Sequence, residues 1–181
     1  MYQSIKNSVV VLFLIATLTS CNQGLTLQGY YVANQETPNF ISVDIPVSFV
    51  NVEKIDLTAE QEEAYESIDK LNMLGYTLTD DNAEEYKAEL DKINTILKDE
   101  KYEDLMRGGN SKDGKFVVKY IGTDNSIDEL IVFGSATDRG FAIVRILGDE
   151  MDPAKIMKLG EVINKMETEE NAVEDIMKFF Q

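Results

Sequence analysis

The amino-acid sequence predicts an α+β fold, in which helices pack against a largely antiparallel β-sheet. Three patterns lead to this prediction. Apolar residues alternate strictly with polar ones over 40–50, recur at helical spacing over 58–71 and 81–106, and alternate again in three stretches between 115 and 147. The turns between those three stretches are shorter than the crossover that parallel strands need, so the strands should be antiparallel neighbours. A chain of 181 residues with 44% apolar content is expected to form one domain.

The first strand is expected in the stretch 40–50. Its apolar positions are Ile41, Val43, Ile45, Val47 and Phe49. Such alternation is typical of a half-buried strand. Pro46 has no backbone N–H to donate, so this strand should lie at an edge of the sheet or break there.

Two helices are expected next, with a short strand over 73–79 between them. Thr58 and Gln61 have the spacing of a capping box, which predicts that a helix starts there. Its inward positions are Ala64, Tyr65, Ile68 and Leu71. The second helix has the clearest apolar stripe, formed by Tyr86, Leu90, Ile93 and Leu97. Residues 102–106 should continue it or form another short helix, which would end at the glycine pair 108–109.

The second half of the chain should form three strands, at 115–121, 127–133 and 140–147. The third is apolar on both faces, which predicts the central strand of the sheet. Asp152 and Pro153 are typical of a helix start. The inward positions of that helix would be Ile156, Leu159, Ile163 and Met166.

A last helix would have an apolar stripe formed by Val173, Ile176, Met177 and Phe180. This stripe could lie in the groove of a partner protein or dock on the sheet of its own chain. We favour the second interpretation, because terminal helices often close a core.

The N-terminal residues have the three-part layout of a secretory signal. Lys6 precedes an apolar run of 10 residues, Val9–Leu18, which is followed by small residues. This run is too short to cross a hydrocarbon core of about 30 Å as a helix. The sequence Leu18-Thr19-Ser20-Cys21 resembles the bacterial lipobox, which implies cleavage before Cys21 and acylation of that residue.

These features predict three parts of the chain. Residues 1–20 would be a lipoprotein signal peptide, residues 21–38 a lipidated tether and docking segment, and residues 39–181 the α+β domain. Loss of the signal peptide removes one Lys and no acid, which changes the formal charge from −16 to −17. An anionic membrane surface should repel a domain of this charge. The lipid chains alone would then hold the domain near the membrane.

Composition excludes several classes of function. The chain has 17 Lys and Arg residues against 33 Asp and Glu residues, no His and one Cys. Nucleic acid is not expected as a partner, because a charge of −16 repels the phosphate backbone. A single Cys excludes intramolecular disulfides and Cys-rich metal sites, and the lack of His excludes His-based catalysis.

One short segment has part of the pattern of a calcium loop. Asp124, Ser126 and Asp128 occupy its first, third and fifth positions, where oxygen ligands are needed. Glu129 and Ser135 stand where the loop requires Gly and a bidentate Glu. A solvated hairpin turn is therefore the preferred interpretation, with these three residues kept as metal candidates.

Arg145 is the candidate for binding an anionic ligand, because it lies in an otherwise apolar strand. The preferred alternative is a structural Arg, whose methylenes pack while its head reaches solvent or an acid. Acidic residues are abundant, but no spacing marks a catalytic pair, so no catalytic residue is predicted. No cofactor is expected either.

Five stretches carry a resemblance to a known family: Phe40–Pro46, Tyr65–Leu74, Ile96–Met106, Ile127–Gly134 and Gly140–Gly148. In this order they resemble a family of small Bacteroidota lipoproteins known only as domain of unknown function 4252. The resemblance spans about residues 26–160 and ends before the C-terminal tail. It implies a tethered envelope domain with an α+β body, and it implies no activity and no catalytic residues.

We therefore expect a lipoprotein of the bacterial cell envelope, anchored to the outer membrane through Cys21 and facing the periplasm. Its expected role is that of a non-enzymatic binding or interaction module, with an envelope protein as partner. Two alternatives stay open: a carrier of an apolar ligand or lipid in a cavity, and a hydrolase using carboxylates or a divalent cation. The oligomeric state is left open as well.

Overall fold

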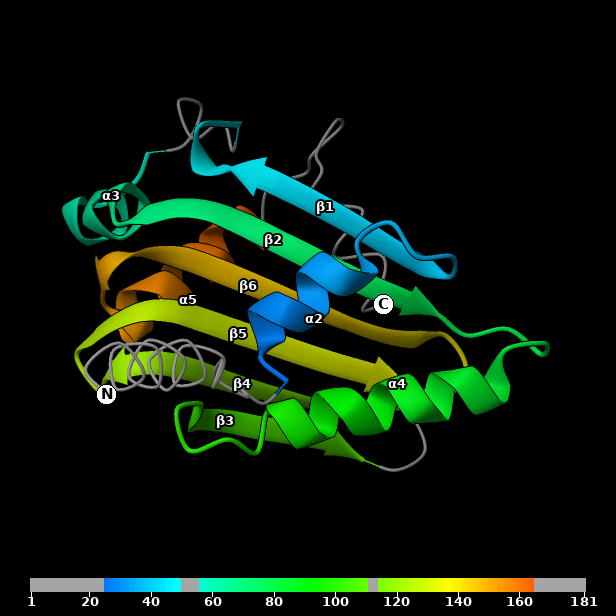
Figure 1. The fold of residues 1–181 in the computed structure, drawn as a ribbon. Coiled ribbons are helices and arrows are strands. Elements are labelled where there is room, and N and C mark those ends of the chain that lie inside the picture. The colour runs from blue at the N-terminus through cyan, green and yellow to red at the C-terminus, as the bar shows by residue number, and fades with distance from the viewer. Residues whose placement is uncertain (1–24, 50–55, 111–113, 165–181) are drawn as a thin grey trace, which may run out of the picture.

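The computed structural model describes residues 25–49, 56–110 and 114–164. Its centre is a six-stranded sheet with the order β1-β2-β6-β5-β4-β3, in which all neighbouring strands are antiparallel (Figure 1). The strands are β1 Phe40–Pro46, β2 Ile68–Thr77, β3 Glu103–Asn110, β4 Gly114–Thr123, β5 Ser126–Ala136 and β6 Gly140–Met151. The helices are α2 Leu27–Asn34, α3 Ala59–Glu66, α4 Ala83–Ile96 and α5 Pro153–Asn164, and the 3-10 turn η1 Val47–Phe49 follows β1. The α+β prediction is confirmed.

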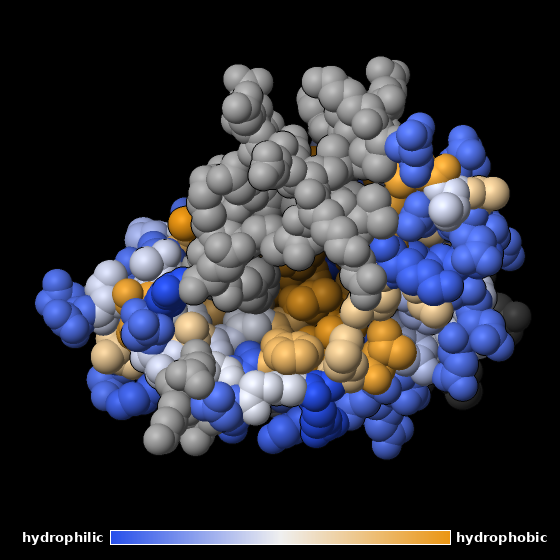
Figure 2. All heavy atoms as spheres, turned by 180° about the vertical axis from the view of Figure 1, so that it is seen from behind, coloured by the Kyte–Doolittle hydropathy of each residue, from blue (hydrophilic) through white to orange (hydrophobic). Residues whose placement is uncertain are grey.

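Helices lie on both faces of the sheet. α2 and α4 cover the face turned to the viewer in Figure 1, which we call the front face, and side chains of both helices join its apolar core. α3 and α5 contact each other and pack at one end of the opposite, back face. Figure 2 shows apolar side chains near the middle of the back face and hydrophilic ones around its rim.

A row of aromatic side chains fixes both front helices to the sheet. Phe40, Tyr76 and Phe141 are direct neighbours on β1, β2 and β6. Their ring centroids are 4.9 Å apart for the first pair and 5.5 Å apart for the second. Tyr30 of α2 lies 6.0 Å from Phe40, and Tyr86 of α4 lies 6.0 Å from Tyr76. Aromatic pairs at such distances contribute favourably beyond the area that they bury.

Several predictions are confirmed in detail. β1 is an edge strand that pairs with β2 alone among the described strands, and it ends at Pro46. β6 lies between β2 and β5 and is buried on both faces over most of its length, as expected for a central strand. α5 starts after Asp152, whose carboxylate accepts hydrogen bonds from the backbone N–H groups of Ala154 (2.8 Å) and Lys155 (3.2 Å).

The prediction of a helix over residues 102–106 is wrong, because β3 begins at Glu103 and includes the rest of this segment. This strand is the second edge of the sheet, and most of its side chains are exposed. Its residues therefore show no alternation of apolar and polar types. A register shift between Asp104 and Met106 disturbs the pattern further. Gly109 adopts its positive φ of 92° at the end of this strand and not at the end of a helix.

The helix predicted from Thr58 is shorter than expected. The capping box of Thr58 and Gln61 is present, but α3 ends at Glu66. The hydroxyl of Ser67 donates to the carbonyl of Ala64 (2.8 Å) at this end. Ile68 therefore begins β2, five residues before the strand predicted at 73–79.

Other predictions fall on residues outside the described ranges. These are the signal peptide, Cys21, Met166 and the stripe that begins at Val173. α2 lies within the predicted docking segment 21–38 and contributes three side chains to the front core: Leu27, Tyr30 and Tyr31. Over the described part of the chain, no helix combines the length and apolar character needed to span a membrane.

Candidate ligand-binding groove

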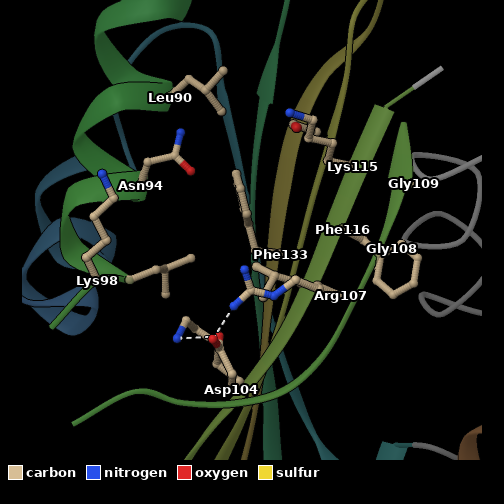
Figure 3. A pocket seen from close by; sticks show the side chains of 14 residues that line it. Leu90, Asn94, Lys98, Asp104, Arg107, Gly108, Gly109, Lys115, Phe116 and Phe133 are labelled. Atoms are coloured by element: carbon tan, nitrogen blue, oxygen red, sulfur yellow. Dashed lines mark hydrogen bonds and ion pairs between the residues drawn. The ribbon is translucent and has the colours of Figure 1, made fainter. Parts of the chain in front are cut away.

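A groove of about 730 Å³ opens on the front face, between α4 and the strands β3, β4 and β5 (Figure 3). The groove exists because α4 lies across one edge of the sheet. The strands at this edge, β3, β4 and β5, follow α4 in the chain. The volume is within the range of small-molecule sites, about 300 to 1,000 Å³.

One side of the groove is formed by α4 and the residues just after it. Leu90, Asn94 and Leu97 are spaced by four and three residues, so they share one side of the helix. Lys98 extends the same side beyond the end of the helix at Ile96. Its positive charge is favourable there, because the carbonyl groups at a helix C-terminus carry partial negative charge.

The opposite side is formed by alternate residues of β4 and by Phe133 of β5. Lys115, Val117 and Lys119 share the front face of β4, so cations flank an apolar side chain. Phe133 is buried in the front core and adds an aromatic surface. Figure 3 shows the ring of Phe116 on the other side of the strands from α4.

The groove is basic although the chain is strongly acidic. Four cations line it: Lys98, Arg107, Lys115 and Lys119. Among the described lining residues, the only carboxylate is that of Asp104, so the lining carries a formal charge of +3. The whole chain has a formal charge of −16. A local field of this sign attracts anions to a surface that otherwise repels them.

Asp104 pairs with two of the four cations. The Nζ of Lys119 lies 2.7 Å from its Oδ1, and Arg107 contacts its Oδ2. The hydrogen bond from Lys119 is the largest cause that lowers the pKa of Asp104 below its usual value. Lys119 also donates to the carbonyl of Tyr102 (2.7 Å), which fixes its position further. Asp104, Lys119 and Arg107 therefore form a structural cluster at one end of the groove.

Lys98 and Lys115 are different, because neither side chain forms an ion pair or hydrogen bond with any of the described residues. Figure 3 shows Lys98 on the α4 side of the groove and Lys115 on the sheet side. Both ammonium groups are therefore available to an anion that enters the groove.

Arg145, the residue predicted as a candidate anion ligand, is not part of the groove. Its Nε and Nη2 donate to Glu129 at 2.6 and 2.9 Å, and both side chains are buried. Burial opposes the charged form, but the Glu129 carboxylate outweighs it and raises the pKa of Arg145. The guanidinium is thus paired with an acid, which is the alternative that the sequence favoured.

Asp124, Ser126 and Asp128 lie at the hairpin between β4 and β5. Thr123 and Ser126 face each other, so Asp124 and the following residue form a two-residue turn. The Asp124 carboxylate accepts a hydrogen bond from Tyr120 (2.6 Å), and this bond raises the pKa of Tyr120 to about 12. Within the described ranges, no group of three or more Cys, Asp or Glu residues is placed to hold a metal ion.

The four groove cations were not predicted as site residues from the sequence. They come from three separate segments that only the fold brings together. One signal was available in β4, where Lys115, Val117, Lys119 and Ile121 share a face. Two cations on the inner face of a strand that also carries core residues indicate a polar site at that face.

Fold and groove together define a single-domain α+β protein with a basic groove on the front of an antiparallel sheet. A comparison with protein families identifies it more closely. The sequence model of the family described as Domain of unknown function (DUF4252) matches residues 30–159, and the chain belongs to this family. Neither curated proteins nor solved structures include a significant match. The predicted resemblance to the family of domain of unknown function 4252 is thereby confirmed.

Proposed function

We propose that this protein is a non-enzymatic binding module of the bacterial cell envelope and that the groove beside α4 is its binding site. The observation that carries the proposal is the charge of the groove, +3 in a chain of −16. Four cations gathered in one groove create a local positive field, which attracts anions to one place on a surface that otherwise repels them. An anion is therefore the class of ligand that this groove is suited to bind.

The groove favours this function over the two alternatives. A carrier that encloses an apolar ligand needs a closed apolar cavity, whereas this groove is open and lined by four cations. A hydrolase that works with carboxylates needs two of them in one concave site. The groove has Asp104, which is held by Lys119 and Arg107.

The membrane anchor is the second part of the proposal. It is supported by the lipobox-like sequence that ends at Cys21. α2 begins at Leu27, six residues after Cys21, and a fully extended chain of that length spans about 20 Å. Acylation of Cys21 would therefore hold the folded domain close to the outer membrane, which we propose as its location, on the periplasmic side.

The anchor is tested with the variant Cys21→Ser. We expect this variant to leave the membrane fraction and to lose labelling by a fatty-acid probe. A Ser20→Ala variant is the matched control, because the lipobox accepts a small residue there. Unchanged labelling of Cys21→Ser would contradict the proposed anchor.

The binding function is tested with a fluorescent reporter in the groove. The chain has no Trp, so a single introduced Trp gives an unambiguous signal. Asn94 lines the groove and is exposed, which makes Asn94→Trp a suitable reporter. Thr95→Trp is the control, because Thr95 is also exposed on α4 but does not line the groove.

We expect small amphiphilic molecules to change the emission of Asn94→Trp saturably and to leave that of Thr95→Trp unchanged. The panel consists of dodecyl compounds with anionic, neutral and cationic heads, each below its aggregation concentration. If no compound in the panel changes the emission of Asn94→Trp, the groove is not a binding site of this kind.

A further inference from the structure

We infer that the ligand of the groove is an amphiphilic organic anion, with a carboxylate or phosphate head between Lys98 and Lys115 and an apolar part against Val117 and Phe133. This inference rests on the proposed binding function and assigns the chemical class of the ligand. Three features of the groove lead to it: unpaired cations, an apolar surface on both walls, and the Asp104 cluster at one end.

The first feature is the free charge of Lys98 and Lys115. The chain has 33 acidic residues, yet none of the described ones pairs with either ammonium group. Charge-assisted hydrogen bonds from two Lys side chains suit a carboxylate or a phosphate, because these heads offer several acceptor oxygens. A neutral head would gain less from these two ammonium groups, and a cationic head would be repelled by them.

The second feature is the apolar surface on both walls of the groove. Leu90 and Leu97 on the helix side face Val117 and Phe133 on the sheet side. Inorganic phosphate would leave this surface exposed to water, whereas a hydrocarbon or aromatic body would cover it. The ligand should therefore gain affinity from its apolar part as well as from its head.

The third feature decides where the head lies. Asp104 already neutralises part of the charge of Lys119 and Arg107, and its own charge repels an anion from that end. Lys98 and Lys115 have no such acid among the described residues of the lining. The anionic head should accordingly contact Lys98 and Lys115, and Arg107 and Lys119 should contribute little.

The test uses the full chain with Cys21→Ser and Asn94→Trp, so that neither acyl chains nor detergent compete for the groove. Dodecylphosphate, dodecanoate, dodecyl maltoside, dodecyltrimethylammonium and inorganic phosphate are titrated separately. We expect dodecylphosphate and dodecanoate to bind at least about tenfold more tightly than the maltoside, the ammonium compound and inorganic phosphate.

Charge variants locate the head. Lys98→Gln and Lys115→Gln should each raise the Kd for dodecylphosphate roughly tenfold, the loss of one charge-assisted hydrogen bond. Lys158→Gln removes the same charge from α5 on the back face and should leave the Kd unchanged. Both groove variants should also weaken the dependence of the Kd on salt, because fewer charges are then screened.

The outcomes separate the ligand class from the binding function. Equal Kd values for dodecylphosphate and dodecyl maltoside would overturn the anion inference and leave the groove a binding site. Equal Kd values for dodecylphosphate and inorganic phosphate would overturn the amphiphilic part. Failure of every compound to change the emission would overturn the proposed function itself.

Discussion

Arg145 and Glu129 form a buried ion pair on the front face of the sheet. The two hydrogen bonds measure 2.6 and 2.9 Å, and the side chains are 7% and 10% exposed. Arg145 is on β6 and Glu129 on β5, offset by two residues from direct opposition. A guanidinium and a carboxylate of this geometry compensate each other's loss of hydration.

Breaking this pair should destabilise the fold strongly. We expect Glu129→Gln or Arg145→Met to lower the free energy of unfolding by about 3–5 kcal/mol, because each leaves a buried charge without its partner. Urea denaturation followed by circular dichroism measures the change. The double variant Glu129→Leu/Arg145→Met removes both charges and should lose less than either single variant.

The exposed residue Lys87 provides the control for this experiment. It pairs with Glu84 at the surface of α4 (2.9 Å). Lys87→Gln should leave the unfolding midpoint unchanged, because exposed pairs contribute little. A loss for Lys87→Gln equal to that for Glu129→Gln would show that burial of the pair is not the cause.

Two buried tyrosines should respond in opposite ways to loss of the hydroxyl. The hydroxyl of Tyr31 accepts a hydrogen bond from Ser42 (2.9 Å) and lies 2.8 Å from the carbonyl oxygen of Met73, to which it can donate. The buried hydroxyl of Tyr76 has no partner in hydrogen-bond geometry among the described residues, although burial and the nearby Glu85 carboxylate raise its pKa to about 12. Tyr31→Phe should therefore cost about 1–3 kcal/mol, and Tyr76→Phe should be neutral or stabilising by up to about 1 kcal/mol.

Both variants keep the aromatic ring, so differences in packing do not obscure the comparison. Unfolding midpoints in urea give the two values. A larger loss for Tyr76→Phe than for Tyr31→Phe would mean that Tyr76 has a polar partner.

Stability at alkaline pH should depend on Tyr31. Burial is the main cause that raises the pKa of Tyr31 to about 12, against 10.0 for an unperturbed tyrosine. The folded state therefore favours the protonated hydroxyl. This contribution is fully present below pH 10.0, and it is lost as the pH rises from 10.0 towards 12.

Urea unfolding at several pH values between about 9 and 12 measures this dependence. We expect Tyr31→Phe to show a smaller decrease in stability over this interval than the wild type, because one ionisation is removed. The other tyrosines remain in both proteins and give the wild-type background. Equal slopes would show that Tyr31 titrates alike in the folded and unfolded states.

The sheet was predictable where burial determines the residue types along a strand. Apart from Arg145, β6 is apolar on both faces from Phe141 to Ile146, and this composition predicts a central strand. β3 was missed because an exposed edge strand has no core face to impose a period on its residues. The spacing of Leu105 and Met106 then resembled the end of a helix.

The groove was not predictable from local patterns. Lys98 and Lys115 are 17 positions apart in the chain. β3 lies between α4 and β4 in the sequence and contributes further lining residues. Arg145 attracted attention because it is a lone cation in an apolar strand, but that environment indicates a buried pair at least as well as a ligand site. Distinguishing the two requires the position of Glu129, which the pairing of β5 and β6 determines.

Two glycines provide a last, paired prediction about the backbone. Gly140 starts β6 with a φ of 127°, and a Cβ there would lie 1.9 Å from the carbonyl oxygen of Tyr76. Gly160 lies in α5, and a Cβ there would have no heavy atom within 4 Å. Gly140→Ala should therefore destabilise the protein by about 3 kcal/mol or more. Gly160→Ala should stabilise it by about 0.5–1 kcal/mol, because Ala favours the helix.

Thermal or urea unfolding of the two variants measures both effects on the same scale. The expected signs are opposite although the substitution is identical, because one site combines a positive φ with the backbone of β2 at close range and the other is an open helical position. A stable Gly140→Ala variant would show that β6 can shift away from Tyr76 at its first residue. Since the Tyr86 ring of α4 lies 6.0 Å from the Phe141 ring of β6, such a shift should also alter the position of α4 and hence the width of the groove.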